Sequence, residues 1–187
     1  MVLDPRRIPL EIEGDVVHLH AWEVADAARI NEAVERNLEH LRPWMPWIAE
    51  EPLDLDTRTA LLTRWTVDRG AGLGANFGML LDGEVVGGCG LHRRIGEDGL
   101  EIGYWVDAGH VGRGIATAAT AMLTTAATRD AGATHVEIHH DEANLASRRV
   151  PEKLGYRLLG TFPDEVSAPG EVGIEWRWRI ERDEWDP

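Results

Sequence analysis

The feature that most constrains the fold is a glycine-rich segment, Val106–Ala116, which joins a strand-like run to a helix-like run. Its sequence is VDAGHVGRGIA, with glycines at 109, 112 and 114 and a basic residue at Arg113. Glycine adopts positive φ without steric cost and lets the backbone approach a ligand closely. The first N–H groups of a helix have no intrahelical acceptor and lie at the positive end of the helix dipole. The segment therefore predicts a binding site for a phosphate or pyrophosphate group.

Hydrophobic periodicity around this segment predicts a mixed α/β domain. Apolar or alternating runs predict strands at Val16–Trp22, Asn76–Leu81, Glu84–Leu91, Gly99–Val106, Thr134–His140, Tyr156–Phe162 and Val172–Ile180. Helical spacing predicts helices at Asp26–Leu41, Asp54–Arg69, Ile115–Asp130 and Ala146–Leu154. The chain has 187 residues and shows no linker and no repeat, so we expect a single domain over residues 1–187.

Composition and charge argue against nucleic acid and membranes as partners. The formal net charge is −14, which argues against nucleic acid because phosphates would be repelled. This charge is compatible with a cationic amine acceptor, although solubility alone also explains it. The N-terminal segment has no apolar signal region and no run approaches membrane-spanning length, so we expect a cytoplasmic protein with no membrane partner.

The cysteine and histidine content predicts neither a disulfide nor a metal site. Cys89 is the single cysteine, and its glycine neighbours suggest a small buried residue. The eight histidines lack metal-ligand spacing, and strand alternation sends His139 and His140 to opposite faces.

Three motifs carry a resemblance to a known family. They are EIGYW at 101–105, VGRGIATAA at 111–119 and NLASRRVPEKLGY at 144–156. Together they resemble the GNAT superfamily of acyl-CoA-dependent N-acyltransferases, and with LRPWMPW at 41–47 they are similar to its RimJ/RimL branch. Over residues 16–180, the resemblance implies an α/β GNAT fold: a mixed sheet of about seven strands, splayed between the fourth and fifth, with about four helices.

The resemblance also implies where acetyl-CoA binds. The pyrophosphate would contact backbone N–H groups of the loop and helix start, so the apolar residue at 111, where the family has Gln or Arg, should not matter. The pantetheine arm would lie in the gap beside strand Gly99–Val106. Arg113 could instead be an ordinary exposed arginine, Asn144 a helix cap, and Trp105 an ordinary strand residue. The implied binding residues are Val111, Gly112, Arg113, Gly114, Ile115, Ala116, Trp105, Val106 and Asn144.

Two further residues match the family's catalytic positions. An amine attacks only when neutral, so a base must take its proton. The resemblance assigns this role to Glu101 and gives Ser147 the hydrogen bond or proton for the departing CoA thiolate. Glu101 could instead be a solvated strand carboxylate, and Ser147 a helix-start hydroxyl. Pro151 should bend or loosen the helix beside Ser147, because it removes one N–H.

The acceptor is less constrained by the sequence. By resemblance, Trp44 and Trp47 border the acceptor entrance and Tyr104 is a further substrate-binding residue, although the indoles could simply cover the core edge and Tyr104 could be an ordinary strand residue. RimJ/RimL enzymes acetylate N-terminal α-amino groups, so we expect a protein or peptide N-terminus. Other acyl donors such as succinyl-CoA, small amines such as polyamines or aminoglycosides, and a CoA-binding regulatory protein with little turnover stay open. A homodimer is expected from resemblance alone.

Overall fold

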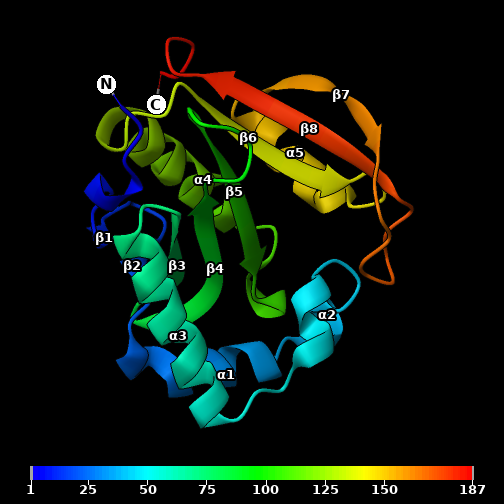
Figure 1. Cartoon of the computed structure of the whole chain (residues 1–187). Helices are drawn as coiled ribbons and strands as arrows, with labels where there is room; N and C mark the ends of the chain where they lie inside the picture. The colour runs from blue at the N-terminus through cyan, green and yellow to red at the C-terminus, as the bar shows by residue number, and fades with distance from the viewer. Residues whose placement is uncertain (1, 187) are drawn as a thin grey trace.

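The computed structural model describes residues 2–186, which form one eight-stranded sheet with helices on both faces (Figure 1). The strands, in the order β1-β2-β3-β4-β5-β6-β8-β7, pair antiparallel except for the parallel pair β5 and β6. The strands are β1 (Glu11–Ile12), β2 (His18–Ala21), β3 (Gly74–Leu81), β4 (Glu84–His92), β5 (Gly99–Val106), β6 (His135–Asp141), β7 (Arg157–Pro163) and β8 (Ile174–Glu181). The α-helices are α1 (Ala27–Glu35), α2 (Leu38–Leu41), α3 (Leu55–Gly70), α4 (Ile115–Thr125) and α5 (Leu145–Lys153).

The α/β class is confirmed, but the predicted count of seven strands is too low by one. The additional strand, β1, has two residues and is too short to show an alternating pattern. It pairs with β2, where Glu11 accepts hydrogen bonds from His18 and His20 at 2.6 Å each. Contacts between separate segments therefore define this strand.

The predicted helix at Asp26–Leu41 is wrong as a single helix, which raises the number of α-helices to five. The chain leaves the helix at Arg36 and Asn37, between α1 and α2. Both side chains reach Asp107, with Arg36 Nε at 2.8 Å and Asn37 Nδ2 at 2.7 Å from the carboxylate. The predicted helix at Ile115–Asp130 is α-helical only as far as Thr125, because its last five residues, Ala126–Asp130, form a π-helical turn.

Two apolar clusters hold the helices on the sheet. Residues of α1 and α3 pack with Trp22 on one face, while α4 packs on the other face. Glycines of β3 and β4 make room for indole rings: a Cβ at Gly78 would lie 2.3 Å from the Trp22 ring, and one at Gly88 would lie 2.6 Å from Trp105 Nε1. Cys89 is buried as predicted, and burial raises the pKa of its thiol.

The predicted splay in the sheet is confirmed, between the strands labelled β5 and β6. These strands pair at only three positions, ending where Glu101 lies opposite Glu137. Beyond this point β6 continues to pair with β8 as far as Asp141, while β5 follows β4. The segment from Ile102 to Val106 therefore has no ladder partner on β6, which leaves backbone groups of β5 free to bind a ligand.

Candidate active site

The glycine-rich loop has the backbone conformation that the sequence predicts. Gly112 and Gly114 adopt φ of 78° and 81°, and Gly114 is the N-cap of α4 without a side-chain cap. Both glycines are exposed, and a Cβ on either one would meet no atom within 4 Å. The first helical hydrogen bond runs from the Ala118 N–H to the Gly114 carbonyl at 2.9 Å. The N–H groups at the start of α4 therefore border open space.

Asp107 anchors this loop to α1. Its carboxylate accepts hydrogen bonds from Arg36, from Asn37 and from the Gly109 N–H at 2.8 Å, and the Ala108 N–H donates to Asn37 Oδ1 at 2.8 Å. Burial alone would raise the pKa of Asp107, but the hydrogen bonds from Asn37, Arg36 and Gly109 hold it well below its usual range. An ionised carboxylate thus fixes the start of the loop.

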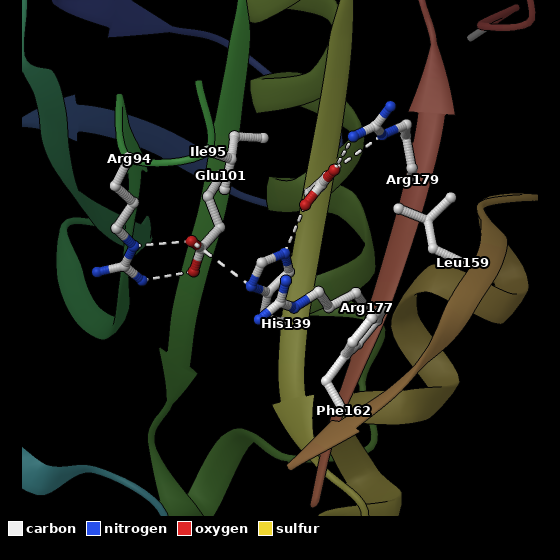
Figure 2. A pocket seen from close by; sticks show the side chains of 9 residues that line it. Arg94, Ile95, Glu101, His139, Leu159, Phe162, Arg177 and Arg179 are labelled. Carbon is white, nitrogen blue, oxygen red and sulfur yellow. Dashed lines mark hydrogen bonds and ion pairs between the residues drawn. The ribbon is translucent and has the colours of Figure 1, made fainter. Parts of the chain in front are cut away.

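Glu101 lies where β5 and β6 separate, and it is buried, with 6% of its surface exposed. The alternative of a solvated strand carboxylate is therefore wrong. Arg94, from the loop between β4 and β5, bonds both carboxylate oxygens, with Nε to Oε2 at 2.7 Å and Nη2 to Oε1 at 2.5 Å. Figure 2 shows the Glu101 side chain between Arg94 and His139 of β6. Glu101 is thus oriented from two sides.

His139 connects Glu101 to further charged residues. Its Nδ1 lies 3.8 Å from Glu101 and 3.3 Å from Glu175, and its Nε2 lies 2.6 Å from Glu137. Glu137 in turn accepts from Arg179 Nε at 2.8 Å. Burial alone would lower the pKa of His139, but Glu137, Glu101 and Glu175 raise it above its ordinary value. We call the contacts from Arg94 through Glu101, His139 and Glu137 to Arg179 the charged network.

His140 points to the opposite face of β6, as alternation predicts. Its Nε2 accepts a hydrogen bond from Trp178 Nε1 at 3.0 Å, and its ring stacks on Trp176. Among residues 2–186, no group of three or more His, Cys, Asp or Glu side chains is arranged to hold a metal ion.

Ser147 and Asn144 lie at the start of α5. Asn144 is the N-cap, and its Oδ1 accepts from the Ser147 N–H at 3.1 Å, so its capping role is present. The Ser147 hydroxyl lies 3.0 Å from the phenol of Tyr104 on β5. Glu101, Tyr104, Asn144 and Ser147 line one cavity of about 250 Å³. The structure thus brings both predicted catalytic residues to the same cavity.

Residues 44–46 and the loop between β7 and β8 both contribute to the lining of this cavity. Trp44 lines it together with Asp164 and Glu171 of that loop and Glu175 of β8. The Gly170 N–H donates to the Pro43 carbonyl at 2.9 Å, which joins this loop to the end of α2 (Figure 1). This hydrogen bond links the two segments that contribute to the lining of the cavity.

The remaining predicted site residues lie apart from the cavity. Trp47 packs on Trp105, with ring centroids 6.5 Å apart, and Val106 packs against the core. Val111 and Arg113 are exposed on the glycine-rich loop, the Ile115 side chain is buried beneath it, and Ala116 is half-buried. The indole of Trp47 thus packs on Trp105, and of the two tryptophans expected at the acceptor entrance only Trp44 lines the cavity.

Arg94 and His139 belong to the site, but the sequence prediction missed both. Arg94 belongs to no recognisable sequence motif, and it approaches Glu101 only because β4 and β5 pair as a hairpin. His139 carried a weak signal: alternation places it on the same face as Glu137, whose strand neighbours Glu101 in the predicted sheet. Among residues 2–186, no helix has the length and apolarity needed to cross a membrane.

Comparisons with known proteins agree with this geometry. Residues 17–157 match the family model described as "Acetyltransferase (GNAT) domain". The chain is 34% identical over 157 residues to "Putative ribosomal N-acetyltransferase YdaF" of Bacillus subtilis (strain 168), covering 82% of this chain and 85% of that protein. The Mycobacterium smegmatis RimJ structure in complex with CoA-disulfide superposes with a TM-score of 0.80 at 26% identity, over 91% of this chain and 84% of that one.

A second structure shares the fold at lower identity. RimL, the ribosomal L7/L12 alpha-N-protein acetyltransferase, in complex with coenzyme A, has a TM-score of 0.83 at 17% identity, over 93% of this chain and 97% of that one. The expected resemblance is confirmed: the chain belongs to the GNAT acetyltransferase family, with relatives in the RimJ/RimL branch.

Proposed function

We propose that the protein transfers an acetyl group from acetyl-CoA to a primary amine, and that the acceptor is the N-terminal α-amino group of a protein or peptide. The observation that carries this proposal is the shared cavity: Glu101 and Ser147 both line it, at the point where β5 and β6 separate. A buried carboxylate and a hydroxyl in one cavity are the groups that acyl transfer to an amine needs.

The chain's own groups fit acetyl-CoA as donor. The open N–H groups at Gly112–Ala116 suit a pyrophosphate, and the unpaired edge of β5 near Trp105 and Val106 suits the amides of pantetheine. Asn144 lines the cavity next to Ser147. When bound, acetyl-CoA supplies the acetyl group as a thioester. The RimJ and RimL structures similar to this chain are complexes with CoA-disulfide and CoA.

Glu101 acts as the general base in this proposal. Arg94 and His139 hold its carboxylate in one orientation, and each oxygen keeps a lone pair for the amine proton. As the C–N bond forms and the C–S bond breaks, the amine proton passes to Glu101. The Ser147 hydroxyl donates a hydrogen bond to the departing sulfur, whose negative charge it stabilises.

The chemistry favours an α-amino group over a lysine side chain. An α-amino group has a pKa of about 7.7–8.0 and lysine about 10.4. At pH 7.5, roughly a third of α-amino groups are neutral, against about one lysine in a thousand. Deprotonation of an α-amine at this pH therefore costs less free energy than deprotonation of a lysine, so less is required of Glu101 as the base. The names of the B. subtilis relative and of RimL point to ribosomal protein substrates, and RimL's name specifies an α-amino group.

A matched acceptor series tests this proposal. One peptide carries a free N-terminus and no lysine, and its partner carries a blocked N-terminus and one lysine; a polyamine and an aminoglycoside complete the series. We expect acetylation, measured by mass spectrometry, of the first peptide only. Exclusive acetylation of lysine or of the small amines would overturn the proposed acceptor.

Two substitutions test the residue roles by thiol release from acetyl-CoA. Ser147→Ala should lower kcat about 10- to 100-fold, because a hydrogen bond to a charged group contributes about 1.5–3 kcal/mol. Glu101→Gln should lower it more, by about 10²–10⁴-fold. Wild-type turnover in both variants would contradict both residue assignments, whereas CoA binding without turnover on any acceptor of the series would favour a CoA-binding protein.

A further inference from the structure

Pro151 leaves one carbonyl of α5 without its helical donor. In an α-helix each N–H donates to the carbonyl four residues earlier, so the donor for the Ser147 carbonyl would come from position 151. Proline has no N–H and normally kinks or ends a helix interior. Here α5 continues past Pro151 to Lys153, so Pro151 removes one hydrogen bond but does not end the helix.

Tyr104 supplies the missing donor. Its phenol O–H donates to the Ser147 carbonyl, with an O···O distance of 3.1 Å. The same phenol oxygen lies 3.0 Å from the Ser147 hydroxyl. A side chain of β5 therefore reaches across the gap between β5 and β6 and holds both polar oxygens of one residue on α5.

The direction of these two hydrogen bonds follows from a proton count. A carbonyl oxygen only accepts, so the single phenol proton goes to the Ser147 carbonyl. The Ser147 O–H then donates to the phenol oxygen. Burial raises the pKa of Tyr104, so the phenol keeps its proton throughout the physiological pH range.

We infer that Tyr104 is a positioning residue for Ser147, and that Pro151 gives it this role by freeing the Ser147 carbonyl. The inference rests on the proposed role of Ser147 in the acetyl transfer. Rotation about one bond turns the Ser147 O–H from the phenol oxygen into the gap. Tyr104 stays in place during this rotation because its own proton is held by the carbonyl. Tyr104 thus acts through Ser147, although it was expected to contact the acceptor.

A kinetic cycle tests whether Tyr104 acts through Ser147. Tyr104→Phe should lower kcat about tenfold, the size of one hydrogen bond, and change the KM for acetyl-CoA less than about twofold. Combined with Ser147→Ala, it should add no further loss. A double variant about tenfold slower than Ser147→Ala alone would overturn the inference, because Tyr104 would then act independently.

A stability cycle on the protein without substrate tests the link to Pro151. Pro151→Ala restores an N–H for the Ser147 carbonyl, so the shift in urea midpoint caused by Tyr104→Phe should be at least halved in the Pro151→Ala background. An equal shift in both backgrounds would overturn the link. If Tyr104→Phe alone fails to fold, we expect Pro151→Ala to rescue it, and failure to rescue would count against the inference.

The other tyrosine provides a matched control. Tyr156, the second of two in the chain, is buried, and the hydrogen-bond partner of its phenol is Thr124 Oγ1, at 2.6 Å. Tyr156→Phe should shift the urea midpoint equally with and without Pro151→Ala. If Ser147→Ala proves kinetically silent, the proposed function fails, while the stability cycle still decides the link between Tyr104 and Pro151.

Discussion

Two parts of the region around the gap between β5 and β6 offer different chemical groups. The glycine-rich loop before α4, here called the backbone side, presents backbone N–H groups that Gly112 and Gly114 leave accessible. The charged side is the charged network, whose side chains come from both edges of the gap, from three strands and one loop. A backbone site depends on local conformation, whereas a side-chain network depends on the tertiary fold.

This difference predicts which substitutions each side should tolerate. Val111, where the family has Gln or Arg, is exposed and leaves the backbone donors of the loop in place. Glu101 and Glu137 are buried, so removal of His139, which lies between them, would leave buried negative charge less well compensated. We therefore expect the two sides to respond differently to mutation, and the following predictions run from the largest expected effect to the smallest.

Asp107→Ala should have the largest effect on stability, because the backbone side depends on this one carboxylate. The buried amide of Asn37 and the guanidinium of Arg36 would lose their shared acceptor. We expect a loss of about 3 kcal/mol in the free energy of unfolding, measured with guanidinium. Asp107→Asn, which keeps one acceptor oxygen, should lose less. Equal losses in the two variants would show that charge alone matters there.

Gly114→Ala should weaken the backbone side without unfolding it. A residue with a Cβ at φ of 81° costs about 1–2 kcal/mol, and CoA affinity should fall because the loop relaxes. Gly70→Ala at the end of α3 is the matched control: its φ is not positive, a Cβ there meets no atom within 4 Å, and alanine favours the helix. Calorimetric titration with CoA should separate them, and unchanged affinity in Gly114→Ala would contradict a backbone-built donor site.

His139→Gln should change how stability depends on pH on the charged side. The folded-state pKa of His139 is raised, so its stabilising contribution is full below about 6.5 and is lost as pH rises through the higher folded value. The stability difference between wild type and His139→Gln should therefore shrink as pH rises. His135 on the same strand has a lowered pKa, from burial and from Arg179, so His135→Gln should show the opposite trend. A parallel trend in both variants would contradict this account.

Arg94→Ala should have the smallest effect. The Arg94 side chain is 60% exposed, so its ion pair with Glu101 should contribute less than about 1 kcal/mol to stability in urea unfolding. We expect kcat/KM to fall a few-fold, because His139 still contacts Glu101. A loss as large as that of Glu101→Gln would mean that Arg94 itself touches the reacting groups.

The same contrast between local conformation and tertiary contacts explains which features the sequence could predict. The conformation of the glycine-rich loop and the paired strands on either side of Asp82–Gly83 depend on neighbours in the chain, and these predictions are confirmed. The helix break at Arg36 depends on Asp107, 71 residues later, and the contact of Arg94 with Glu101 depends on the hairpin register. Tyr104 and Pro151 are linked only through the Ser147 carbonyl of α5. Such contacts have no local pattern.

The central claim is that donor binding and proton removal depend on separate groups, the backbone N–H groups of the glycine-rich loop for the first and the Glu101 carboxylate for the second. Its most direct measurement is a pair of values for Glu101→Gln in one buffer: the Kd of CoA by calorimetry and kcat/KM for a peptide with a free N-terminus. We predict a Kd within about twofold of wild type and a kcat/KM lower by at least about 100-fold. A Kd that weakens in parallel with kcat/KM, or an unchanged kcat/KM, would contradict the account.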